Sequence, residues 1–209
     1  MENILNKIGQ INSSATARYN VVLERVLKTS IEMLKDRGYS LVNDCRTIGD
    51  ITYKMQENEP VLFGESVGKP EVVLFFHNEE RIGVKQLRVW NEAYPDKQII
   101  IVSLEGPTAF TRKEADSNYP NIQFFLFQQL CVNITKHALV PKHECLDLTE
   151  RSNIKVRVFN DEDWPKLYTN DPIAQYYNYK PGDLIKITRT VGYPEPVYFY
   201  RFVCNAPSN

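Results

Sequence analysis

The sequence has no marked excess of either charge, since 25 Lys and Arg residues stand against 26 Asp and Glu residues. A protein that binds nucleic acid unaided usually carries a basic excess, because much of its affinity comes from neutralising phosphates. We therefore expect any nucleic-acid contact to be local, or to be shared with partner proteins that supply the positive charge.

Cysteine is scarce and widely spaced. The four cysteines, at positions 45, 131, 145 and 204, include no C-x-x-C pair. No apolar run is long enough to span a bilayer, and the first residues lack the features of a signal peptide. We expect a reducing intracellular compartment with free thiols and no association with membranes.

Four residues of the types that bind zinc, Cys131, His137, His143 and Cys145, fall within fifteen positions. Their spacings of six, six and two residues match no usual zinc knuckle or finger. Cys131 also lies in an apolar stretch, where a cysteine behaves as a small buried hydrophobic residue. The prediction is that the protein has no metal site.

Glycine-rich phosphate-binding patterns are missing as well, which argues against a nucleotide cofactor, and we predict none. The two most apolar runs, residues 72–76 and 99–102, contain no acidic residue. A metal-dependent nuclease needs carboxylates at strand ends to hold Mg²⁺ near a phosphate. Glu71 and Glu105 lie close by, but surface carboxylates are the simpler interpretation. A nuclease-like enzyme on the N-terminal part is kept as an alternative.

What the sequence does contain predicts two folded domains. Residues 1–17 are polar and small and are predicted to be a flexible tail. Apolar residues then recur at spacings of three and four from Tyr19 to Leu34, which predicts a helix that Gly38 ends.

The remainder of the predicted N-terminal domain, residues 18–137, alternates between strands and helices. Apolar runs at 61–63, 72–76, 99–102 and 124–127 predict strands, and a helical period spans 84–94. A helix is also expected near 112–117. A strand–helix–strand unit of this kind places its strands parallel with a right-handed crossover. The expected domain is α/β, with helices packed on a small sheet.

Residues 138–209 are rich in charges, prolines and tyrosines and predict a small α+β domain. A helix is expected near 171–177, and strands are expected at 184–188 and 197–203. The order Lys-Pro-Gly-Asp at 180–183 is typical of a type II turn. The segment Thr149–Phe159 remains ambiguous, because its alternation favours a strand while its first residues could start a helix.

Specific motifs also follow one another in this C-terminal part, at residues 139–143, 164–167, 170–177, 179–189 and 198–203. Their order and spacing resemble the C-terminal assembly domain of the fifth subunit of eukaryotic RNA polymerases, a family whose archaeal counterpart has no N-terminal domain. Shorter stretches at 35–39, 81–85, 106–109 and 130–137 resemble motifs of the eukaryotic N-terminal domain. The resemblance therefore implies the eukaryotic two-domain form.

The resemblance implies a non-catalytic structural subunit that is not an enzyme by itself. The N-terminal domain would form part of a jaw near downstream DNA, and the C-terminal domain would anchor to the largest subunit, close to the sixth. The DNA-proximal residues carried over are Pro107, Thr108 and Ala109, and the basic residues Arg112 and Lys113 nearby could touch a phosphate.

Eight residues are predicted to form the subunit interface. They are polar, charged or aromatic residues of the matching motifs: His143, Asp171, Pro172, Tyr176, Lys186, Arg189, Tyr200 and Arg201. For the tyrosines of the last motif, filling the domain's own core is an equally good interpretation.

The chain also departs from the family pattern, above all at residues 190–196, where no contact can be carried over. Such divergence is expected of a distant eukaryote or of a large DNA virus with its own polymerase. The location would be the nucleus for a cellular protein, and the host cytoplasm or virion for a viral one. A regulatory protein that mimics the subunit is a further alternative.

Overall fold

The computed structural model describes residues 13–42, 47–78, 81–155, 163–190 and 195–207. The chain divides into two compact units, Met1–Val132 and Asn133–Asn209, whereas the sequence suggested a junction after residue 137. Among the residues described, no helix has the length and apolarity to cross a lipid bilayer.

The N-terminal unit is built on a five-stranded sheet in the order β1-β2-β3-β4-β5. The strands are β1 (Ser40–Leu41), β2 (Leu62–Glu65), β3 (Val72–His77), β4 (Gln98–Ser103) and β5 (Ile122–Leu126). The last three strands run parallel, and β1 and β2 add to the sheet in antiparallel fashion. All six residues of β3 are buried, as expected for a parallel strand covered on both faces. The predicted α/β architecture is confirmed.

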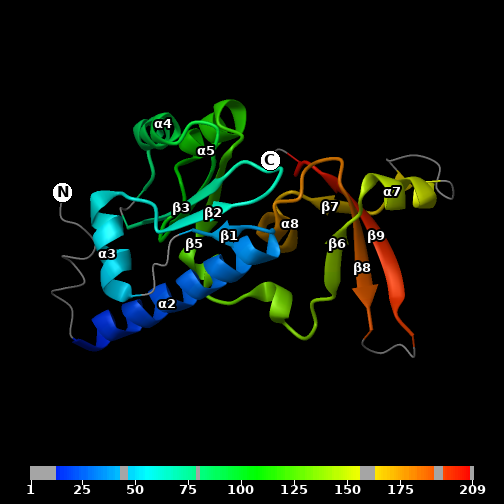
Figure 1. Cartoon of the computed structure of the whole chain (residues 1–209), viewed down its shortest axis with the longest axis horizontal. Coiled ribbons are helices and arrows are strands. Elements are labelled where there is room, and N and C mark those ends of the chain that lie inside the picture. The colour runs from blue at the N-terminus through cyan, green and yellow to red at the C-terminus, as the bar shows by residue number, and fades with distance from the viewer. Residues whose placement is uncertain (1–12, 43–46, 79–80, 156–162, 191–194, 208–209) are drawn as a thin grey trace. The chain divides into compact units, whose positions relative to one another are not determined.

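Helices cover both faces of this sheet (Figure 1). They are α2 (Ser13–Asp36), α3 (Ile48–Glu57), α4 (Val84–Ala93), α5 (Ala109–Asn118) and the short α6 (Phe127–Leu130). Leu87 and Trp90 of α4 and Ala115 of α5 pack with Val73 and Phe75 of β3 in one core cluster. Helix α2 lies on the opposite side of the sheet from α4 and α5.

Helix α2 begins at Ser13, so residues 13–17 belong to a helix and not to the predicted tail. Ala15 and Ala17 are strong helix formers. Alanine adds little to an apolar period, so the sequence pattern did not reveal this first part of the helix. Residues 1–12 lie outside the described part of the chain. At the other end, Gly38 (φ 85°) donates to Lys35 and Tyr39 donates to Leu34. These two bonds form a Schellman motif, and the prediction that Gly38 ends the helix is confirmed.

The C-terminal unit has a four-stranded sheet in the order β6-β8-β9-β7. Its elements are η1 (Ile134–Lys136), β6 (Lys142–Cys145), α7 (Leu148–Lys155), β7 (Lys166–Tyr168), α8 (Pro172–Tyr177), β8 (Leu184–Arg189) and β9 (Val197–Cys204). The predicted α+β class is confirmed. Gly182, with φ 98°, occupies the left-handed position of the predicted turn before β8, and Asp183 donates to the Lys180 carbonyl.

The ambiguous segment begins as a helix, α7. The Asp147 carboxylate accepts the Glu150 backbone N–H at 2.7 Å, and the Glu150 carboxylate accepts the Asp147 N–H at 3.3 Å. This reciprocal capping of two backbone donors stabilises the helix start and decides against a strand. Residues 156–159, at the end of the segment, lie outside the described residues.

The two faces of the C-terminal sheet have separate cores. On one face, Ile185 and Ile187 of β8 and Val203 of β9 pack with Leu167 and Ala174. On the other face, Leu184 packs with Leu146 and Trp164, and Tyr200 and Phe202 complete that cluster. Alternation along β8 and β9 therefore places successive side chains in different surroundings.

Candidate functional site

The β8–β9 hairpin exposes one large aromatic ring on each face of the C-terminal sheet. Tyr198 lies opposite Thr188 and is 51% exposed, and Phe199 lies opposite Ile187 and is 42% exposed. A cation covers each ring: Lys186 Nζ lies 4.5 Å from the Tyr198 centroid, and Arg189 Cζ lies 5.3 Å from the Phe199 centroid. These contacts order the long side chains while leaving charge and ring at the surface.

His143 shares the face of Phe199, because both lie opposite Ile187 in neighbouring strand pairs. Its ring Nδ1 donates to the Pro141 carbonyl at 2.7 Å. Burial lowers the pKa of His143, and the nearby charges of Arg201 and Arg189 lower it further. The bond to Pro141 and the Asp171 carboxylate oppose this shift. His143, Asp171, Arg189 and Arg201, all predicted interface residues, therefore share one electrostatic environment.

Asp171 has a structural role at the start of α8. Its side chain accepts the Ile173 backbone N–H at 2.8 Å, and its carbonyl accepts the Gln175 N–H. Pro172 occupies the first helical position, where its missing N–H costs nothing, and its side chain is exposed. The predicted Asp-Pro pair is thus explained by helix capping, whatever else it contacts.

Tyr176 does not lie at the surface as predicted. It is only 3% exposed, and its hydroxyl accepts a hydrogen bond from Asn133 Nδ2 at 3.0 Å. Its ring lies edge-on to Tyr177, with the centroids 5.1 Å apart. Tyr176 lies on the face of α8 that packs into the core of the C-terminal unit. It therefore stabilises the unit beneath the proposed interface.

Tyr200 and Arg201 have roles within the unit as well as at its surface. Tyr200 is partly buried and lies edge-on to Trp164, 5.9 Å between centroids, which agrees with the core interpretation. Arg201 is exposed, and its Nη1 donates to the Lys166 carbonyl at 3.0 Å. That bond links β9 to the edge strand β7.

The loop predicted to lie near DNA follows β4 and leads into α5. Thr108 caps this helix, since its hydroxyl accepts the Thr111 N–H at 3.1 Å. Pro107 is partly buried and Ala109 is exposed. Arg112 and Lys113 are exposed on α5, the helix expected near residues 112–117. Arg112 Cζ lies 6.0 Å from the Phe124 ring centroid.

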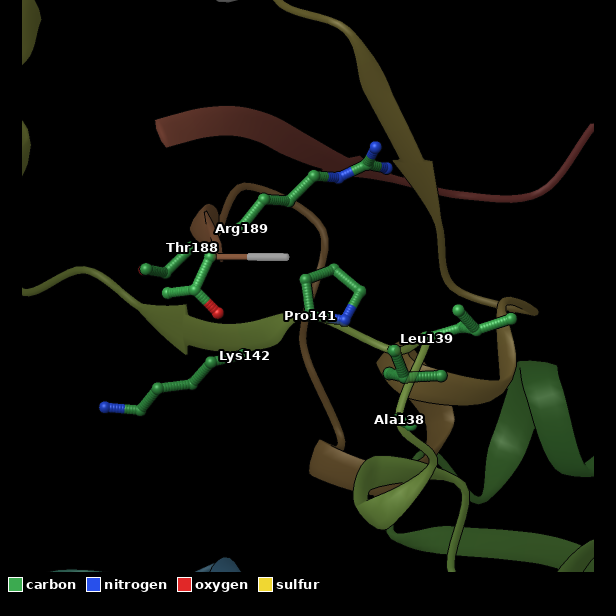
Figure 2. Close-up of a pocket in the computed structure, with 8 residues that line it drawn as sticks. Ala138, Leu139, Pro141, Lys142, Thr188 and Arg189 are labelled. Atoms are coloured by element: carbon green, nitrogen blue, oxygen red, sulfur yellow. The ribbon is translucent and has the colours of Figure 1, made fainter. Parts of the chain in front are cut away.

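Two surface features were missed from the sequence. Phe110, in the first turn of α5, is 70% exposed. A hollow of about 410 Å³ lies between residues 138–142 and residues 188–190 of the C-terminal unit (Figure 2). The pairing of β6 with β8 brings the two walls of the hollow together, and local sequence does not encode that pairing.

No group of three or more His, Cys, Asp or Glu side chains within the described ranges is arranged to hold a metal ion. Cys131, Cys145 and Cys204 are free thiols, and Cys45 lies outside the described residues. Burial raises the pKa of the Cys145 thiol, which disfavours the reactive thiolate.

Comparison with known proteins gives a family match on the C-terminal unit. The family described as "RNA polymerase Rpb5, C-terminal domain" matches residues 132–203. This range contains the hairpin except its last residue, the hollow and all eight predicted interface residues.

Similarity to curated proteins extends into the N-terminal unit. The chain is 27% identical over 186 residues to "DNA-directed RNA polymerases I, II, and III subunit RPABC1" of Caenorhabditis elegans, covering 80% of this chain and 88% of the relative. It is 28% identical over 176 residues to the protein of that name in Dictyostelium discoideum, covering 80% and 89%. It is 27% identical over 215 residues to "DNA-directed RNA polymerases IV and V subunit 5B" of Arabidopsis thaliana, covering 92% and 94%. With its two-unit architecture and its ordered C-terminal motifs, the chain is similar to the fifth subunit of DNA-directed RNA polymerases over both units, and residues 132–203 match that family's C-terminal domain.

Proposed function

We propose that this chain is a non-catalytic structural subunit of a multisubunit DNA-dependent RNA polymerase. The observation that carries the proposal is the β8–β9 hairpin, where exposed rings and ordered cations lie among residues of the family motifs. Aromatic and arginine side chains supply much of the binding energy at protein interfaces. The hairpin therefore has the composition of a docking surface.

The C-terminal unit is the proposed anchor, with the largest polymerase subunit as its main partner and the sixth subunit close by. His143, Arg189 and Arg201 would act directly at this interface, and Asp171 would hold α8 in place. Tyr176 takes no direct part because it is buried.

The N-terminal unit is the proposed jaw element near downstream DNA. Pro107, Thr108 and Ala109 would face the duplex, with Lys113 and Arg112 offering positive charge from α5. A net charge of −1 suits a light contact, with the duplex held mainly by larger subunits. The compartment follows the polymerase: the nucleus for a cellular protein, or the host cytoplasm or virion for a viral one.

The alternatives from the sequence gain no support from the comparisons. The relatives are named as polymerase subunits and not as nucleases or regulators. At the carboxyl ends of the parallel strands, where a nuclease would place carboxylates, β3 ends with His77 and β4 ends with Ser103.

Arg201→Glu tests the anchor. The tagged variant and the native chain are each co-expressed with the polymerase subunits, and the amount that co-elutes with the largest subunit is measured. We expect at least a roughly tenfold loss for Arg201→Glu, because charge reversal in an interface opposes the partner's complementary charge.

Lys113→Glu, in the N-terminal unit, is the matched control and should assemble normally. The midpoint of thermal unfolding is measured for each variant, since Arg201 also bonds to Lys166. A loss of assembly no greater than the loss of stability would contradict the anchoring role of Arg201.

A further inference from the structure

The hollow between residues 138–142 and 188–190 has one apolar wall and one basic wall. The apolar wall includes Leu139, which is 80% exposed, and Pro141. In Figure 2 the side chain of Arg189 extends over Pro141 from the end of β8, while Lys142 points away from the apolar wall. Its volume of about 410 Å³ falls in the lower part of the range seen for ligand-binding clefts.

The apolar wall is held in shape by its own backbone. The Leu139 N–H donates to His137 Nδ1 at 3.2 Å, and the Val140 N–H donates to the His137 carbonyl at 2.9 Å. Pro141 has no N–H to offer. This wall therefore presents side chains to a ligand, and exposure of Leu139 to water is unfavourable unless something covers it.

The basic wall takes its positive charge from Arg189. Arg189 lies over the Phe199 ring, a contact that orders the guanidinium without cancelling its charge. Lys142 by contrast is paired with Glu144 at 2.6 Å. Arg189 and Arg201 each act to lower the pKa of His143, whereas the Asp171 carboxylate acts to raise it.

We propose that this hollow binds an extended, acidic segment of another polymerase subunit, with a carboxylate on Arg189 and a neighbouring apolar side chain against Leu139 and Pro141. An arginine fork matches a carboxylate with two parallel hydrogen bonds. The apolar wall favours a protein segment over a nucleic-acid phosphate, which would gain nothing from Leu139. This inference rests on the proposed function and adds the chemistry of the partner segment.

The test places a photo-crosslinking benzoylphenylalanine at position 139 of the tagged full-length chain within the assembled polymerase. After irradiation, the crosslinked peptide is sequenced by mass spectrometry. We expect a segment of a polymerase subunit with Asp or Glu next to an apolar residue. Arg189→Glu should reduce the crosslink yield by roughly fivefold or more, and Arg189→Lys should reduce it much less.

A crosslinker at Tyr53, which is 60% exposed in the N-terminal unit, is the matched control, and its yield should not change with Arg189→Glu. Crosslinking of position 139 to nucleic acid, to a segment without acidic residues, or to nothing in an assembled polymerase would overturn the inference alone. Absence of the chain from the polymerase would instead overturn the proposed function.

Discussion

At the scale of single residues, the buried hydrogen bond between Asn133 and Tyr176 stabilises the C-terminal unit beneath the docking surface. The bond joins two residues 43 positions apart in the sequence. Tyr176→Phe removes the acceptor while keeping the ring, so the free energy of unfolding should fall by about 1–2 kcal/mol, as measured by urea denaturation.

Tyr198→Phe is the control for that change, because Tyr198 is half-exposed and removal of its hydroxyl should leave stability almost unaltered. Incorporation of Tyr176→Phe into the polymerase should follow its stability and no more. Full stability with lost incorporation would instead restore Tyr176 as a direct interface residue.

His143 gives the unit a defined response to acid. Since its pKa in the folded state is lowered from 6.5, the unfolded chain binds the proton more tightly. The stabilisation is therefore complete above about pH 6.5 and is lost as the pH falls through the folded pKa.

The measurement compares urea denaturation of the native chain and of His143→Gln at about pH 7.5 and about pH 5.5. The native chain should lose more stability on acidification than the variant does. Equal losses in both proteins would show that the folded state does not disfavour His143 protonation.

The residues of the site were only partly predictable. His143, Arg189 and Arg201 were identified from motifs, and the structure brings their charges together. Tyr176 was predicted to lie at the interface but is buried. A motif indicates which residues are characteristic of a family, but it does not indicate whether a side chain faces the core or the surface. Leu139 was not identified as a site residue, because its exposure depends on strand pairing between distant segments.

At the scale of elements, the short helix α8 depends on its cap. Six residues supply little helical stability of their own, and Asp171 satisfies an otherwise unpaired N–H. Asp171→Ala should therefore cost about 1 kcal/mol in the free energy of unfolding, whereas Asp171→Asn should cost only a few tenths, because Asn is an equally good cap.

The same pair of variants separates folding from docking. If the Asp171 charge contacts a partner, Asp171→Asn will lose incorporation while it keeps its stability, which can be followed by thermal unfolding alongside co-elution. If both variants assemble in proportion to their stability, the role of Asp171 is confined to the cap.

Long and strongly patterned elements were predicted well, whereas the short edge strands β6 and β7 were not. The stripe from Tyr19 to Leu34 and the apolar runs of β3 and β4 are detectable because burial requires continuous or periodic apolar residues. The edge strands β6 and β7 have four and three residues. They are held by pairing with β8 and β9, which local sequence does not encode.

At the scale of the whole molecule, the two units have separate proposed roles: the N-terminal unit as a jaw element and the C-terminal unit as the anchor. The N-terminal unit has a mixed sheet with helices on both faces. The C-terminal unit has two small cores that leave rings and charges of one hairpin at the surface. The class of each domain could be predicted because apolar periodicity differs between them. The arrangement of side chains on the docking surface could not be predicted, because it depends on the register in which β8 pairs with β9.

Stoichiometric copurification tests the central claim most directly. A tagged copy of the full chain is expressed in the organism of origin, purified under native conditions, and the bound proteins are quantified by mass spectrometry. We predict one copy per polymerase, with the largest subunit and its catalytic partners in equal amounts. Recovery of the chain free of polymerase subunits, or in complexes that lack the largest subunit, would contradict the account.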